Sequence, residues 1–81
     1  GEGEDPLVLL GLAELRHQVA RAIEGLPEKE KLVVSLYYYD ELTMREIGEV
    51  LGYTESRISQ MHTKAILRLR ARLRDLAGAV I

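Results

Sequence analysis

The sequence predicts a small all-α domain of four helices that ends in a helix-turn-helix, similar to a winged helix but without the wing. Apolar residues recur three and four positions apart through most of the 81-residue chain, which is the spacing of one helix face. No segment alternates apolar and polar residues in the way that predicts a strand. Capping residues and glycines divide the helical pattern, so we expect several helices rather than one.

Two helices are predicted in the first half of the chain. Asp5 and Pro6 suit the cap and first position of a helix within 6–24, and Gly25 is its expected stop. A second helix is expected over about 28–39, after Leu26-Pro27. Their inner faces are expected to be the apolar positions Leu12, Leu15, Val19, Ile23 and Leu26 for the first, and Leu32, Val33 and Leu36 for the second.

The helix-turn-helix is predicted at 43–64. Thr43 and Glu46 have the spacing of a capping box, which would start a short helix over 43–51. Gly52 stands where a left-handed residue commonly ends a helix, and Thr54 can cap the next one. Gly48 lies inside the short helix at a cost of about 1 kcal/mol relative to Ala, so we expect the last helix to approach closely there.

The last helix is expected to begin at residue 55 and to be long, because nothing interrupts its pattern before Gly78. Its inner stripe is the set Ile58, Met61, Ala65, Leu69, Leu73 and Leu76. The domain is predicted to span 12–76, with a linker at 1–11 and a C-terminal tail at 77–81.

Composition excludes several classes of protein. The chain has no cysteine, which rules out a disulfide framework and a thiolate metal site. No apolar run approaches the roughly 20 residues of a membrane span. Neither His17 nor His62 has a metal-ligand spacing with another ligand, and the glutamates stand singly, which argues against paired acid–base chemistry. We therefore expect no enzyme activity, catalytic residue, metal, cofactor, small-molecule ligand or membrane partner, and a cytoplasmic protein.

Charge is distributed unevenly along the chain. The net charge is −2, yet residues 57–74 contain six basic side chains and no acidic one. A basic segment on an acidic body indicates nucleic-acid binding more strongly than the total charge does. The alternative is a solvated, arginine-rich helix face with no ligand.

Residues 42–70, together with the Leu26-Pro27-Glu28 start of the second helix, resemble region 4 of the bacterial sigma-70 family of transcription initiation factors. The resemblance covers roughly 12–74. The segment 55–62 is most similar to the alternative branch that controls flagellar genes, or sporulation in actinobacteria. The resemblance to sigma region 4 implies recognition of the promoter −35 element, contact with the β flap of RNA polymerase core, and control by an anti-sigma factor.

Base-reading residues are expected near the start of the second helix of the turn. Arg57 can pair with guanine and Gln60 with adenine, whereas Ser56, Ser59 and Glu55 can serve bases more loosely. Primary sigma factors carry Arg-Glu in place of Glu55-Ser56 and Arg in place of Ser59. The resemblance therefore implies the docking mode but not the promoter sequence.

Contacts to the DNA backbone are expected from residues at helix starts and from cations beside the reading residues. Thr43 and Thr54 combine a cap with a hydroxyl that suits phosphate. Lys29 aligns with a backbone-contacting arginine of the family. The expected set is Lys29, Thr43, Arg45, Thr54, His62 and Lys64, with simple exposure as the alternative for His62.

A protein-partner surface is expected from apolar groups that so small a core does not need. The expected surface comprises the leucines and tyrosines Leu7, Leu9, Leu10, Tyr37 and Tyr38, and in addition the cation Arg68. A helical partner with acidic groups near the Arg68–Arg74 segment would fit this surface. Two alternatives stay open: a module whose main role is to bind a protein, and the DNA-binding domain of a response regulator.

Overall fold

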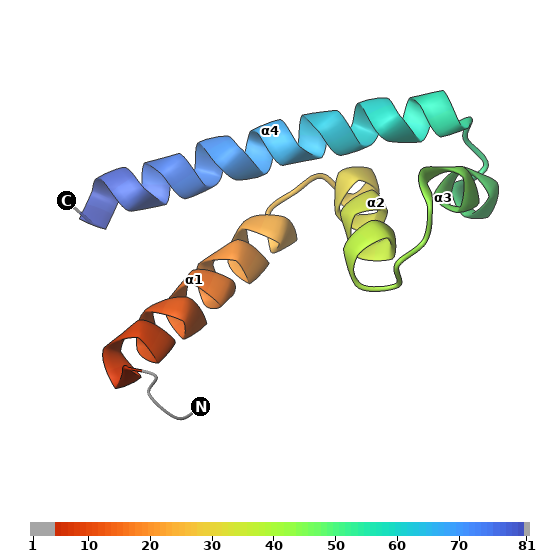
Figure 1. The fold of residues 1–81 in the computed structure, drawn as a ribbon. Coiled ribbons are helices and arrows are strands. Elements are labelled where there is room, and N and C mark those ends of the chain that lie inside the picture. The colour runs from red at the N-terminus through yellow and green to blue at the C-terminus, as the bar shows by residue number, and fades with distance from the viewer. Residues whose placement is uncertain (1–4, 81) are drawn as a thin grey trace.

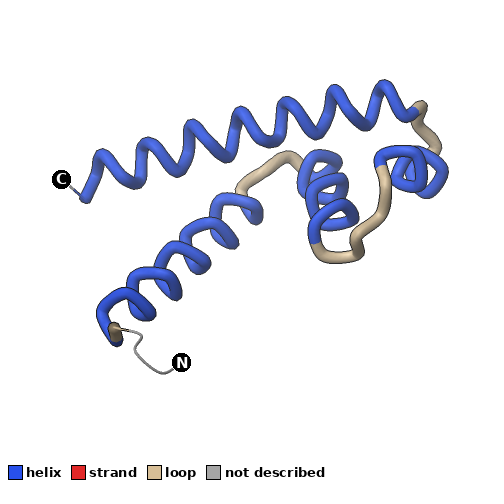
Figure 2. The backbone as a smooth tube through the Cα atoms, viewed as in Figure 1, coloured by secondary structure: helices blue, strands red, loops and turns tan. Residues whose placement is uncertain are grey.

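Four helices make up the computed structural model, which describes residues 5–80, with the backbone alone for 77–80. They are α1 (Pro6–Glu24), α2 (Glu28–Tyr38), α3 (Met44–Leu51) and α4 (Glu55–Val80). Figure 2 shows helices and connecting loops over the described residues, and no strand among them. The all-α prediction is confirmed.

Helix α4 is the element on which the others assemble. It runs the length of the molecule, and α1, α2 and α3 all contact it from one side (Figure 1). The steep crossing of the short α3 against the start of α4 forms the helix-turn-helix. Among the described residues, no other helix lies on the opposite side of the first half of α4 (Figure 1).

Helix α1 begins where its cap predicted. The Asp5 carboxylate accepts a hydrogen bond from the Leu7 amide at 2.9 Å, and Pro6 stands in the first turn. Only Ala22 of this helix is buried, so the expectation that Leu12 and Leu15 would line the core is wrong. They are exposed because the first turns of α1 diverge from α4 (Figure 1).

The core has two parts, one on each side of α2. Val33, Ile47, Ile58 and Met61 join α2 to the helix-turn-helix. Leu26, Val34 and Ala65, with Ile23 and Leu69 against them, join α2 to α1 and to the middle of α4.

Leu32 was predicted to face the core but is 45% exposed, and Val34 takes its place. The reason is that α2 is packed on two sides at once, by α4 as well as α3, so the buried stripe is centred between Val33 and Val34. In α3, Ile47 and Gly48 are buried, whereas Val50 is exposed.

The turn between α3 and α4 has the predicted chemistry. Glu46 N donates to Thr43 Oγ1 at 3.1 Å and Thr43 N donates to Glu46 Oε1 at 2.9 Å, which completes the capping box. The pKa of Glu46 is lowered by the hydrogen bond from the Thr43 backbone and then by that with its side chain. Gly52 ends α3 with φ at 78°, a left-handed conformation that suits glycine.

Gly48 marks a close backbone approach in this motif. A Cβ atom at Gly48 would lie 2.5 Å from the Tyr53 carbonyl oxygen and 3.4 Å from the Thr54 carbonyl carbon. The approach comes from the turn that leads into α4, which refines the predicted contact with the helix itself.

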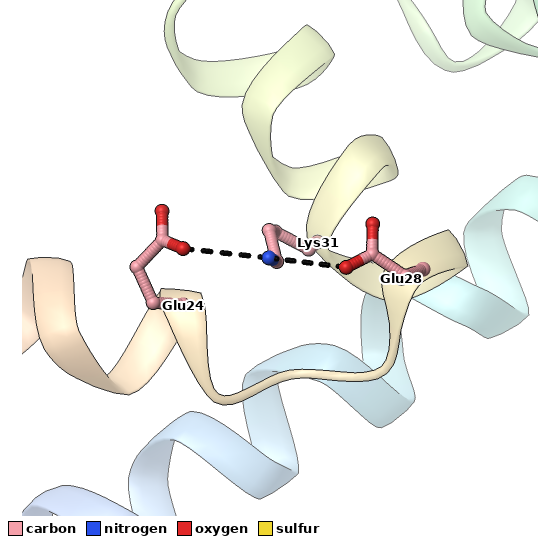
Figure 3. A network of polar contacts seen from close by, with 3 residues as sticks. All are labelled: Glu24, Glu28 and Lys31. Atoms are coloured by element: carbon pink, nitrogen blue, oxygen red, sulfur yellow. Dashed lines mark hydrogen bonds and ion pairs between the residues drawn. The ribbon is translucent and has the colours of Figure 1, made fainter.

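The junction of α1 and α2 is held by one lysine between two glutamates. Lys31 Nζ lies 3.4 Å from Glu24 Oε2 and 3.3 Å from Glu28 Oε1 (Figure 3). These partners, Glu28 first, raise the pKa of Lys31. The contacts are exposed and so contribute little to stability, but they bridge the turn between the helices.

Most of the residues predicted as linker (1–11) and tail (77–81) belong to helices. Residues 6–11 form the first turns of α1, and α4 continues through Gly78 to Val80. The domain limits 12–76 therefore stay a prediction, and residues 1–4 and 81 lie outside the described part of the chain.

Candidate nucleic-acid interface

The outer face of α4 begins at the N-terminus of the helix. Ile58, Met61 and Ala65 point into the core, so the side chains on the opposite face point away from the domain. That outward line consists of Ser56, Gln60, Thr63, Leu67, Arg70 and Arg74, all of them exposed. Two of the predicted base-reading residues, Ser56 and Gln60, thus lie centrally on the surface that a groove-reading helix presents.

The remaining predicted base readers flank this line. Glu55 and Ser59 are exposed on the side of α4 toward α3 and Thr43, and Glu55 shares a shallow depression with Thr43. Arg57 is exposed on the other side, toward the start of α2. Arg57 therefore lies to one side of the outward line, whereas Gln60 lies on it.

A groove of about 300 Å³ gathers four predicted contacts. Its walls carry Lys29 from the first turn of α2 and Arg57, Gln60 and Lys64 from α4. Lys29 and Arg57 lie 28 positions apart in the sequence, so the fold brings the cations of two helices together beside the outward line. Glu28 and Glu30 line the same groove, but Arg57 and Lys64 stand on its α4 side, where they suit contact with a polyanion backbone.

Tyr53 contacts Lys29, one of the residues that line this groove, although Tyr53 was not among the predicted DNA contacts. Lys29 Nζ lies 5.6 Å from the centre of the Tyr53 ring, within range of a cation–π contact. Lys29, through hydrogen bonding and then its charge, lowers the pKa of the Tyr53 phenol, and the charge of Arg57 acts in the same direction. The only signal in the sequence was an aromatic residue directly before the cap of the last helix.

Both predicted threonine caps are present. Arg57 N donates to Thr54 Oγ1 at 3.1 Å, in the same way that Thr43 receives the Glu46 amide. Each hydroxyl accepts from the backbone and keeps its own hydrogen, so capping and phosphate binding are compatible. Arg45 is exposed on α3, with Nε 3.6 Å from Glu49 Oε1, and it lies apart from the groove of Lys29 and Arg57.

His62, also predicted to contact the DNA backbone, does not line the groove of Lys29, Arg57 and Lys64. Its Nε2 is 3.2 Å from the Tyr38 hydroxyl, and its ring packs 5.1 Å from the centre of the Tyr37 ring. These contacts hold the imidazole, half-buried, against the C-terminal end of α2 rather than in the groove with Lys64. The geometry therefore favours a packing role for His62 over the predicted phosphate contact.

The basic residues of the last helix do not form one stripe. Lys64, Arg68 and Arg72 follow Arg57 along the side of α4 that faces the start of α2 and the end of α1. Arg70 and Arg74 lie on the outward line instead. The predicted single surface over Arg68–Arg74 is thus divided between two sides of the helix.

The predicted partner surface is also divided. Leu7, Leu9 and Leu10 are exposed on the first turns of α1, and Leu10 is 68% exposed. Tyr38 is exposed at the far end of α2, where Tyr37 packs against the core. Arg68 pairs instead with Glu30, at the start of α2.

No group of three or more potential metal ligands occurs among the described residues. None of the helices over the described residues combines the length and apolar character of a membrane span.

Comparison with known proteins gives a consistent set of relatives. Residues 22–71 match the family described as Sigma-70, region 4. The chain is 54% identical over 74 residues to the RNA polymerase sigma factor FliA of Yersinia enterocolitica, an alignment that covers 91% of this chain and 32% of that protein. It is 56% identical over 57 residues to the RNA polymerase sigma-D factor of Bacillus subtilis (strain 168), covering 70% and 22%.

A solved structure shares the fold. The chain superposes with a TM-score of 0.77 and 36% identity on a chain of the cocrystal structure of the flagellar sigma/anti-sigma complex, Sigma-28/FlgM. The match covers 91% of this chain and 32% of that one. The chain thus spans about a third of the length of these relatives.

Proposed function

The chain belongs to the sigma-70 region 4 family, in the flagellar branch, and from this membership and the geometry of α4 we propose that it recognises the −35 element of promoters. In this proposal the start of α4 enters the major groove, Ser56 and Gln60 face base edges, and Arg57 reads a base near the groove edge. Lys29 and Lys64 contact the flanking phosphates. This is a binding function without chemistry, carried out in the cytoplasm on the promoters of flagellar genes.

The observation that carries the proposal is the open face of α4 beside the groove that contains Lys29, Arg57 and Lys64. No described helix covers the outward line that starts at Ser56. The cations of Lys29, Arg57 and Lys64 border this line on one side. An exposed helix start bordered by cations is the arrangement that reads a DNA groove in helix-turn-helix proteins.

Alanine variants test the proposed division of roles. Gln60→Ala and Arg57→Ala should each cost about 1–3 kcal/mol on a cognate promoter and should relax preference at one base position. Lys64→Ala should weaken binding to all DNA sequences alike. It should also reduce the slope of the salt dependence of binding by about one, as expected for the loss of one phosphate contact. Fluorescence anisotropy against a panel of single-base variants of the −35 element separates these outcomes.

Arg16→Ala is the matched control, because Arg16 is exposed on α1 and its removal changes the net charge equally. If Arg16→Ala weakens binding as much as Lys64→Ala, general charge and not the α4 face is responsible. If Arg57→Ala affects every sequence equally, Arg57 is a backbone contact and only Gln60 remains as a base reader.

A second proposed function is binding to proteins, namely the β flap of RNA polymerase core and an anti-sigma factor. Two observations favour it: the exposed apolar turns of α1, which include Leu7, Leu9 and Leu10, and the structural relative that was solved as a sigma/anti-sigma complex. Contiguous exposed apolar groups commonly mark protein interfaces. An acidic helix would also complement the arginines on α4.

A competition experiment tests this second function. A candidate anti-sigma factor should reduce binding of the domain to polymerase core or to promoter DNA. The variant Leu7→Ser/Leu10→Ser should bind the anti-sigma factor more weakly than the wild-type domain does. Undiminished binding of all three partners together would exclude a blocking mechanism.

A further inference from the structure

An ion pair joins Glu30, at the start of α2, to Arg68 in the middle of α4, and the Arg68 side chain is 58% exposed. Glu30 is 8% exposed and is the one charged residue that is buried among the described residues. Arg68 Nε lies 3.0 Å from Glu30 Oε1 and donates a hydrogen bond to Oε2 at 3.2 Å. Nε carries a single hydrogen, so Oε1 receives the charge of Arg68 without a directed hydrogen bond.

The pair stands between two grooves. Glu30 lines the groove that contains Lys29, Arg57 and Gln60. Arg68 lines the larger groove of about 760 Å³ between α1 and α4. Lys29 is the neighbour of Glu30 in the first turn of α2, so whatever holds Glu30 against α4 also sets where Lys29 stands.

Stability alone does not account for this pair. Val34 and Ala65, with Leu26 just before α2, already join α2 to α4 through apolar contacts. A salt bridge whose arginine is exposed to solvent contributes little to stability. What a charge-assisted hydrogen bond adds is direction, because it is strong only over a narrow range of angles.

We propose that Glu30 and Arg68 are positioning residues, which fix the first turn of α2 on α4 and hold Lys29 beside Arg57 and Gln60 for contact with a DNA phosphate. The functional half of this proposal rests on the DNA-binding function above. Its structural half, the placement of Lys29, is independent of DNA. The two halves are therefore tested by separate measurements.

Tyr53 reports the position of Lys29 without DNA. Because Lys29 lowers the pKa of Tyr53, displacement of Lys29 should return that pKa toward the ordinary tyrosine value. NMR titration of ¹³C-labelled tyrosine follows Tyr53 separately from the other three tyrosines. The test variant is Glu30→Leu/Arg68→Met, and Lys29→Ala gives the titration expected when the lysine is absent.

The matched control is Glu14→Leu/Arg16→Met, which makes the same changes at exposed residues of α1. The proposal expects Tyr53 of the test variant to titrate close to that of Lys29→Ala, and the control to stay close to wild type. A test variant that titrates like wild type overturns the proposal. If Glu30→Leu/Arg68→Met does not fold, Glu30→Gln, which keeps the shape and one acceptor, takes its place.

The consequence for DNA is measured by a double-mutant cycle. In the wild-type background, Lys29→Ala should weaken promoter binding several-fold and reduce the salt slope by about one. In the Glu30→Leu/Arg68→Met background the same substitution should have a much smaller effect. Equal effects in both backgrounds overturn the positioning role. No effect of Lys29→Ala in wild type refutes its proposed DNA contact, and the tyrosine titration then decides the placement of Lys29 by itself.

Discussion

Gly48→Ala should destabilise the domain, although glycine inside a helix is normally the weaker residue. Alanine would gain about 1 kcal/mol from helix propensity. Its Cβ, however, would lie 2.5 Å from the Tyr53 carbonyl oxygen, a separation that real Cβ atoms essentially never show. The backbone of α3 or of the turn must then move, and overpacking of this kind costs about 1–3 kcal/mol.

The turn cannot move freely, which raises the cost. The amides of Gly52 and Tyr53 both donate to the Gly48 carbonyl at 2.9 Å, and a shift of Tyr53 stretches these bonds, each worth about 1 kcal/mol. Subtracting the propensity gain leaves a net loss of about 2 kcal/mol, which lowers the Tm of a domain of this size by about 8–16 °C. Thermal unfolding followed by circular dichroism measures this shift.

Gly11→Ala is the matched control within the same chain. Gly11 lies inside α1, and a Cβ there would meet no atom within 4 Å. This variant should gain stability by up to about 1 kcal/mol. If Gly48→Ala also raises the Tm, the close approach of the turn does not exist as described and the reasoning fails.

Three further predictions follow from the core, the cap and the charge. Ile47→Ala should cost about 2–5 kcal/mol in urea unfolding, because Ile47 is fully buried, whereas Val50→Ala at an exposed site should change little. The depressed pKa of Glu46 stabilises the fold above the ordinary glutamate pKa and ceases to do so as the pH falls through its folded value. Glu46→Gln should therefore lower the Tm near neutral pH more than near about pH 3, and an equal loss at both pH values would contradict the capping box. Residues 1–81 alone should bind promoter DNA weakly, since the domain is acidic overall and lacks a polymerase tether; anisotropy that shows tight, sequence-specific binding at physiological salt would contradict this.

The sequence by itself determined the local structure and the family. The caps at Asp5 and Thr43, the stop at Gly52 and the start of α4 all involve partners within about four residues, so composition and spacing were sufficient to place them. The order of the Leu-Pro-Glu helix, the turn and the basic helix was equally sufficient to indicate sigma region 4, which the comparisons confirmed.

Only the tertiary structure decided which neighbours meet across helices. A helix period leaves apolar residues on adjacent sides, and the crossing of α2 over α4 determined that Val34, and not Leu32, is buried. The same crossing turned His62 toward Tyr38 and placed Tyr53 beneath Lys29. Glu30 and Arg68 are 38 positions apart, and no spacing rule connects them. Such pairs depend on the angle between helices, which many side chains set together and no short segment encodes.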